Sequence, residues 1–110
     1  MSGPKPPLSL TKRAQRDVRA IQVYTLGTWG PEQAAVYETA IHDAMETLRE
    51  HPKIGTARDE IRPGLLSFPV ERHVLFYRHS RGGIEILRIL HERADAAGQL
   101  RARRSNPSGQ

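Results

Sequence analysis

The chain of 110 residues contains no cysteine, which excludes disulfide bonds and thiolate metal sites and makes a reducing compartment the default expectation. Aromatic residues are few: one tryptophan, three tyrosines and two phenylalanines. No apolar run approaches the ~18 residues of a membrane span, and residues 1–7 contain no apolar signal segment. We therefore expect a cytoplasmic protein without membrane contact.

The histidines and glycines show no spacing that is typical of a metal or phosphate site. The five histidines lack paired cysteine or carboxylate ligands, and Gly82-Gly83 resembles a turn and not a phosphate-binding loop. The sequence thus predicts neither a metal nor a cofactor. Seventeen Lys and Arg against twelve Asp and Glu give a net charge of +5, which suits an acidic partner but also fits a solvated surface.

The length and the patterning indicate one domain. We expect a disordered N-terminus at residues 1–6, a domain at residues 7–100, and a basic flexible tail at residues 101–110. A short strand at residues 7–10 precedes Thr11, a good N-cap for a helix that frays near Gly27. A second helix begins after Gly30, with Pro31 in its first turn, and ends at Pro52. The short connection predicts an antiparallel helical hairpin.

The second half of the chain reads mainly as strands. A loop at residues 54–64 precedes a possible strand at residues 65–68, and a β-hairpin over residues 73–91 turns at residues 80–83. Residues 92–100 have weak helical character. The last strand is apolar on both sides, with Ile84, Ile86 and Leu90 predicted on one face and Leu87 and Ile89 on the other, which is typical of a central strand.

The resulting order is β-α-α-β-β-β. It predicts an α+β fold of two layers, in which the helical hairpin packs on one face of a small, mainly antiparallel sheet. The other sheet face and the sheet edges are then left without intramolecular cover, so we expect them to be available to a partner.

Several local strings, in order, resemble the RelE/ParE superfamily of toxins, and specifically its ParE branch, also described as the plasmid stabilisation system family. The similarity covers about residues 8–100. The strings are Leu10-Thr11, Ala14, Asp17-Val18, Ile21, Tyr24-Thr25, Trp29-Gly30, Gln33-Ala34, Tyr37, His51-Pro52, Ile54-Gly55, Asp59, Ile61-Arg62, Gly64, His73-Val74, Phe76-Tyr77-Arg78, Ile84, Arg88-Ile89-Leu90-His91, Arg93 and Asp95.

The resemblance implies a toxin that is neutralised by a cognate ParD-like antitoxin with an acidic C-terminal segment. Members of the ParE branch poison DNA gyrase, whereas members of the RelE branch cleave mRNA in the ribosome. Operator DNA would be contacted only indirectly, through the antitoxin. Three hypotheses stay open: a gyrase poison, a ribosome-dependent mRNA endonuclease, and a degenerate module that still binds its antitoxin.

Four residues form the candidate set for the endonuclease hypothesis, because arginines can stabilise phosphate charge and histidine can act as general acid or base. They are Arg62, Arg78, Arg88 and His91. The structural alternative is that Arg88 pairs with Glu71 or Asp95. The ParE branch generally lacks the complete nuclease set, so the sequence favours a poison that acts by binding.

Contact candidates come from the basic side of the first helix and from the aromatic residues. The candidates for antitoxin binding are Lys12, Arg13, Arg16, Arg19, Trp29, Arg78 and Arg88. The candidates for toxicity are Arg88, His91, Arg93 and Leu100. We expect Tyr24, Trp29 and Tyr37 to be core residues more than binding residues, although an exposed Trp29 would favour a binding role.

Overall fold

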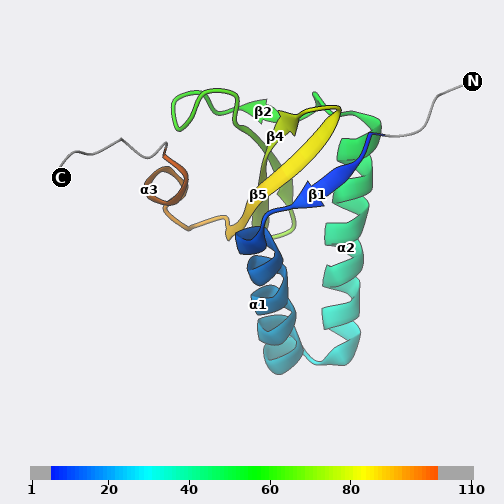
Figure 1. Ribbon diagram of the computed structural model, residues 1–110. Helices are drawn as coiled ribbons and strands as arrows, with labels where there is room; N and C mark the ends of the chain where they lie inside the picture. Colours follow the sequence, from blue (N-terminus) through cyan, green and yellow to red (C-terminus); the bar gives the residue numbers. More distant parts are fainter. Residues whose placement is uncertain (1–5, 102–110) are drawn as a thin grey trace, which may run out of the picture.

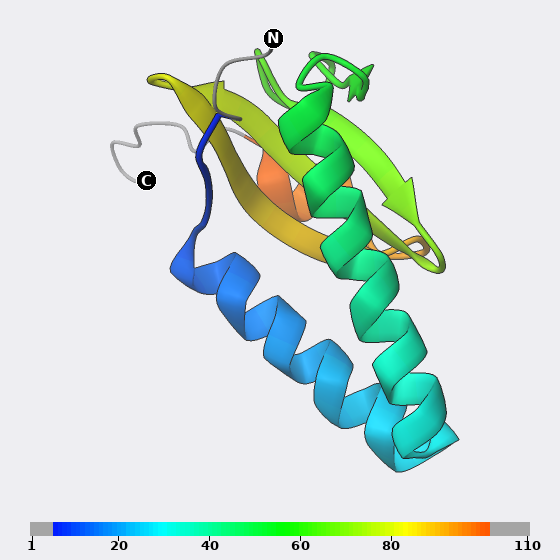
Figure 2. The same cartoon turned by 90° about the vertical axis from the view of Figure 1, so that its right-hand side faces the viewer.

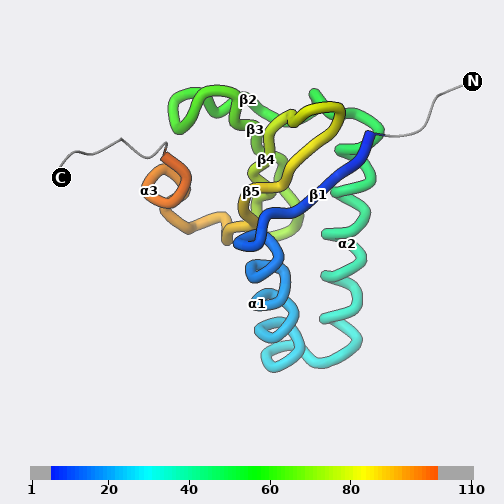
Figure 3. Tube along the Cα trace, viewed as in Figure 1, coloured from blue at the N-terminus to red at the C-terminus, as the bar shows by residue number. Residues whose placement is uncertain are grey.

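The computed structural model describes residues 6–101, so nearly all of the expected disordered N-terminus and basic tail lies outside the described residues. A helical hairpin packs on one face of a five-stranded sheet, which confirms the α+β fold class (Figure 1). The hairpin extends well beyond the sheet, and its two helices diverge toward the sheet end (Figures 2 and 3). No helix in the described range is long and apolar enough to cross a membrane.

The two helices are α1, Lys12–Trp29, and α2, Pro31–Glu50. Thr11 caps α1, because its hydroxyl oxygen accepts a hydrogen bond from the Ala14 amide at 3.0 Å. Helix α1 continues through Gly27, so the expectation that it frays there is wrong. It ends at Trp29 and is followed by the cap residue Gly30, whose φ of 92° is a conformation that glycine adopts without steric cost.

The sheet has the strand order β1-β5-β4-β3-β2. The strands are β1 Leu8–Leu10, β2 Thr56–Ala57, β3 Leu66–Val70, β4 His73–Ser80 and β5 Gly83–His91. β1 is parallel to β5 and the other pairs are antiparallel. The two-residue strand β2 lies inside the segment predicted as a loop. A short helix, α3 (Ala96–Leu100), follows the sheet.

The main core lies between the helical hairpin and the sheet. Helix α1 contributes Ala14, Ile21 and Thr25, which recur at the period of about 3.6 residues that brings side chains to one side of a helix. Tyr77 is fully buried in the same layer, and its hydroxyl accepts a hydrogen bond from the Gly55 amide at 2.9 Å and donates one to the Pro52 carbonyl at 3.0 Å. These two bonds tie the loop after α2 to strand β4.

A β-bulge changes the faces that were predicted for β5. Phe76 pairs with Arg88 and Tyr77 pairs with Ile86, so Leu87 is an extra residue on β5. Because one inserted residue reverses the alternation, Ile89 packs with the helix-side core and Leu90 with the opposite cluster. The predicted division of these apolar residues is therefore wrong beyond the bulge.

The sheet face opposite the hairpin is covered by the chain itself. The segment before β3 and helix α3 pack a second apolar cluster on that face, so the expectation of an uncovered face is also wrong. The buried members are Ile61, Leu65, Phe76, Leu87, Leu90 and Leu100. A partner therefore has to use other surfaces.

Candidate partner-binding surface

An open pocket of about 670 Å³ lies where the part of the helical hairpin that projects beyond the sheet meets the start of β4 and the end of β5. Helices α1 and α2, the turn between β3 and β4, and the end of β5 contribute to it. The lining residues are Asp17, Ala20, Ile21, Tyr24, Thr25, Trp29, Gln33, Tyr37, Glu71, Arg72, His73, Ile89, Leu90 and His91. We call this pocket the aromatic cleft.

Two aromatic side chains at the outer end of the aromatic cleft are exposed to solvent. Trp29 is 62% exposed and Tyr24 is 63% exposed. The expectation that they are core residues is wrong, because the hairpin reaches past the sheet and leaves this part of α1 uncovered. Tyr37 does pack against the core, from a partly buried position. Exposed Trp and Tyr beside a cleft are typical anchors for a partner.

Polar groups line the inner end of the aromatic cleft. The Tyr37 hydroxyl accepts a hydrogen bond from the Arg72 amide at 3.1 Å and hydrogen-bonds to Nδ1 of His73. The His73 ring meets the His91 ring edge-on, with centroids 5.4 Å apart. Burial first, and then the charge of His91, lower the pKa of His73. These contacts join α2 to the ends of β4 and β5.

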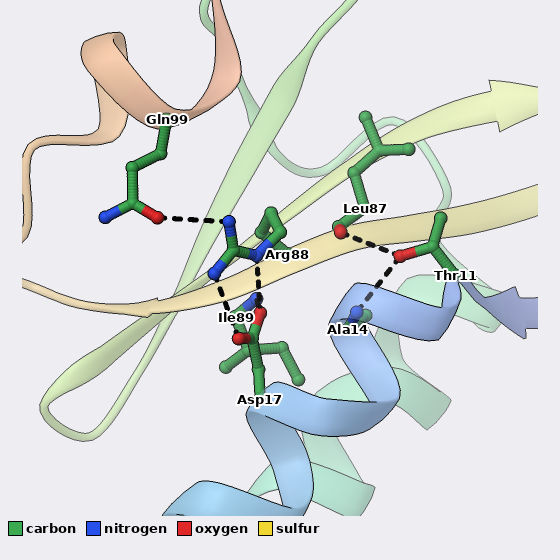
Figure 4. A network of polar contacts seen from close by, with 7 residues as sticks. All are labelled: Thr11, Ala14, Asp17, Leu87, Arg88, Ile89 and Gln99. Atoms are coloured by element: carbon green, nitrogen blue, oxygen red, sulfur yellow. Dashed lines mark hydrogen bonds and ion pairs between the residues drawn. The ribbon is translucent and has the colours of Figure 1, made fainter.

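Asp17 and Arg88 form the best-buried ion pair in the described part of the chain (Figure 4). Nε of Arg88 donates to Oδ2 of Asp17 at 2.8 Å, Nη2 donates to Oδ1 at 3.1 Å, and Nη1 donates to the Gln99 amide oxygen at 3.0 Å. The predicted alternatives, Glu71 and Asp95, are therefore not the partners. Arg88 links α1, β5 and α3, and only 12% of its side chain is exposed.

The basic residues of α1 are exposed as expected. Within residues 6–101 none of them has an ion-pair partner, since Asp17, the acidic residue of this helix, is bound to Arg88. They are Lys12, Arg13, Arg16 and Arg19. The first two turns or so of α1 thus present uncompensated positive charge to solvent.

Two of the four residues of the endonuclease hypothesis, Arg78 and His91, lie far apart on the sheet. Arg78 is near the β4–β5 turn and pairs with Glu85 at 2.9 Å. His91 on β5 lies opposite His73 on β4 in the strand register. Because His73 and Arg78 are five residues apart on β4, His91 lies about 17 Å from Arg78 along the strand. Arg88 is held by Asp17, and Arg62 lies in the segment before β3.

The toxicity candidates lie around the C-terminal segment. Leu100 is 4% exposed and packs in the second cluster, whereas Arg93 is exposed and its amide donates to Nδ1 of His91 at 3.1 Å. Sequence reasoning missed the exposed apolar residues Val23, Leu26 and Val36. The absence of charge between Arg19 and Glu32 was a signal that could have indicated Val23 and Leu26, whereas Val36 lies outside that stretch.

Comparisons with known proteins agree with this fold. Residues 8–96 match the family described as ParE toxin of type II toxin-antitoxin system, parDE. The chain is 38% identical over 92 residues to Toxin ParE1 of Mycobacterium tuberculosis (strain H37Rv), covering 83% of this chain and 94% of the relative. It is 35% identical over 94 residues to Toxin ParE1 of Caulobacter vibrioides, covering 86% and 97% respectively.

A solved structure described as the chromosomal ParDE TA system from P. aeruginosa is also similar. Its TM-score is 0.69 at 26% identity, and the match covers 79% of this chain and 96% of that chain. The family match spans most of the described residues. The chain therefore belongs to the ParE toxin family of type II toxin–antitoxin systems.

Proposed function

We propose that this toxin is neutralised by a ParD-like antitoxin whose acidic C-terminal segment occupies the aromatic cleft and the adjoining basic side of α1. The observation that carries the proposal is the exposure of Trp29, at 62%, beside a pocket of about 670 Å³. A bound segment would cover the aromatic side chains and place its carboxylates near Arg13 and Arg16. Contact with operator DNA would then belong to the antitoxin.

We further propose that the cellular target is DNA gyrase and that the toxin acts by binding. The separation of Arg78 from His91 by about 17 Å along β4 supports this choice, because general acid–base catalysis requires groups within hydrogen-bond reach of one substrate. The ion pair of Arg88 with Asp17 supports it too, because a paired guanidinium is less available to a phosphate. The endonuclease remains the alternative that the experiment must distinguish.

The decisive experiment measures gyrase supercoiling with the purified chain. We expect inhibition that rises with toxin concentration and is relieved by the cognate antitoxin. A parallel assay follows cleavage of ribosome-bound mRNA, where we expect none. Cleavage of mRNA that is lost in His91→Ala at unchanged stability, together with unaffected gyrase, would replace the gyrase proposal by the endonuclease.

The antitoxin surface is tested separately by Trp29→Ala. Truncation of a central interface tryptophan costs at least about 2 kcal/mol, so we expect antitoxin affinity to fall by about 30-fold in calorimetry. Ile54→Ala is the matched control, because Ile54 is 50% exposed and does not line the cleft. Equal affinities of the two variants would show that the antitoxin binds elsewhere.

A further inference from the structure

Five exposed residues of α1 follow one another at alternating spacings of four and three, the pattern of a helix that packs along another helix. They are Lys12, Arg16, Arg19, Val23 and Leu26, and we call them the α1 seam. Ala14, Ile21 and Thr25 face the core, so the α1 seam points away from the sheet. The half near the sheet is basic, and the half near the hairpin tip is apolar.

Helix α2 carries a second row with the same spacing. Its members are Glu32, Val36, Thr39 and Asp43, and we call them the α2 seam. All four are exposed, while Ile41, Ala44 and Leu48 on the opposite side are buried. The two seams therefore lie together on the outer face of the hairpin.

The side-chain hydrogen bond from Gln22 to Glu38, at 2.9 Å, fixes which residues of the two helices are level. Because the helices are antiparallel and rise equally per residue, residues whose numbers add up to about 60 lie level. Val23 is thus level with Val36, and Arg16 and Arg19 are near the level of Asp43. The apolar residues of both seams lie toward the tip, where Glu32 is also found, whereas Arg16, Arg19 and Asp43 lie nearer the sheet.

We propose that this outer face binds a second copy of the chain, with the α1 seam of each copy packed on the α2 seam of the other. A two-fold axis parallel to the hairpin brings the α1 seam of one copy opposite the α2 seam of the other, with level residues facing each other. The two helices in each contact are then antiparallel. Val23 and Leu26 then contact Val36 of the partner subunit, and Arg16 and Arg19 face Asp43 of the partner subunit. Such a contact is self-complementary and closes as a dimer.

Charge identifies the occupant. A purely acidic segment would meet Glu32 and Asp43 on α2, and a purely basic one would meet Arg16 and Arg19 on α1. A second hairpin of this chain carries both signs in the antiparallel order that complements both helices. The 18 residues of α1 extend about 27 Å, enough for four turns of contact. Within one chain the sheet packs on one side of the hairpin only (Figure 1), so in the proposed dimer each sheet would lie on the far side of its own hairpin.

The test measures the mass of the chain in solution by sedimentation equilibrium over a range of concentrations. We expect a dimer for the natural sequence, and a loss of affinity of at least about 100-fold for Arg16→Glu with Arg19→Glu, since like charges then oppose each other at both contacts. Asp43→Arg should also weaken the dimer, because it faces Arg16 and Arg19 of the partner subunit. Mixing the two variants restores opposite charges and should restore a dimer.

Matched controls separate the seams from general charge effects. Arg13→Glu changes the charge of an exposed residue outside the α1 seam and should leave the dimer intact. Val23→Asp tests the apolar half, and circular dichroism verifies the fold of every variant. A natural chain that is monomeric at about 100 μM, a dimer indifferent to the charge reversals, or a mixture that fails to reassociate would each overturn the proposal.

Discussion

Asp17 binds both a backbone amide of β5 and the Arg88 guanidinium, at the point where β5 is no longer paired with β1. Strand β1 ends at Leu10, opposite Ile86, so the next part of β5 has no neighbouring strand on that edge among the described residues. The Asp17 carboxylate takes the place of a strand there, because Oδ2 accepts a hydrogen bond from the Ile89 amide at 2.9 Å. The same carboxylate neutralises Arg88, whose guanidinium in turn holds Gln99 of α3.

We predict that Arg88→Ala lowers the free energy of unfolding by about 3 kcal/mol, because it leaves the Asp17 carboxylate, 15% exposed, without its charge partner. Urea denaturation measures the change. Arg78→Ala is the matched control and should cost under about 1 kcal/mol, because the Arg78 side chain in its pair with Glu85 is 48% exposed. Equal losses in the two variants would contradict this interpretation. Because Arg88→Ala is expected to destabilise the fold, its toxicity has to be compared with its free energy of unfolding.

His73 gives the fold a dependence on pH. Burial and the neighbouring His91 lower the pKa of His73 from its ordinary value of 6.5, so the unfolded chain binds the proton more readily than the folded chain. Tyr37 from α2 and the charges of Asp17 and Glu92 also face this ring, and the two carboxylates oppose part of the shift. The contribution to stability is thus complete above pH 6.5 and is lost as the pH falls through the lowered pKa.

We expect the free energy of unfolding to decrease from pH 7.5 to pH 5, and His73→Gln to reduce this decrease, because glutamine does not titrate. Urea denaturation at a series of pH values provides the measurement. His42→Gln, at an exposed position of α2, is the control and should retain the pH dependence of the natural chain. A dependence unchanged by His73→Gln would assign it to other groups.

At the scale of elements, α3 acts as the cover of the second sheet face. Five residues are too few for a helix to be stable alone, so α3 depends on its contacts. Leu100 packs among Phe76 and Leu90, the Asp95 carboxylate accepts a hydrogen bond from the Gly98 amide at 3.0 Å, and Gln99 binds Arg88. The C-terminal segment is therefore held by side chains that are far away in the sequence.

We predict that Leu100→Ala releases α3, costs about 2 kcal/mol, and weakens growth arrest more than antitoxin binding, because the aromatic cleft lies on the hairpin side of the sheet. Truncation after Gly98 should act in the same direction. Growth on induction is compared with calorimetric antitoxin affinity, and Arg101→Ala at an exposed position is the control. Full toxicity in folded Leu100→Ala would show that the docked helix is dispensable for poisoning.

At the scale of the molecule, the hairpin extends beyond the core that holds it (Figure 2). The side chains Val23, Tyr24, Leu26, Trp29 and Val36 are each more than half exposed. A helix segment that is apolar on nearly all sides is normally buried, so this projection is best explained by contacts outside the chain. Because Arg16 and Arg19 belong both to the antitoxin candidates and to the α1 seam, an antitoxin bound to them would exclude the proposed dimer.

The sequence alone determined the elements that depend on local periodicity and on capping. Thr11, Pro31 and the glycines of the β4–β5 turn mark boundaries through their own conformational preferences, and Ala14, Ile21 and Thr25 show the buried side of α1. The order of these elements and the matching strings led to the ParE family. Such features could be predicted because each is decided within a few residues.

Only the tertiary structure decided how far each side chain is buried and which distant groups pair. The bulge at Leu87 reversed the faces of Ile89 and Leu90, because strand register depends on the partner strand and not on the alternation alone. Asp17 and Arg88 are 71 residues apart in sequence, so no local pattern connects them. Tyr24 and Trp29 are aromatic residues of the kind that is usually buried, yet they are exposed because α1 continues past the edge of the sheet that would have covered them.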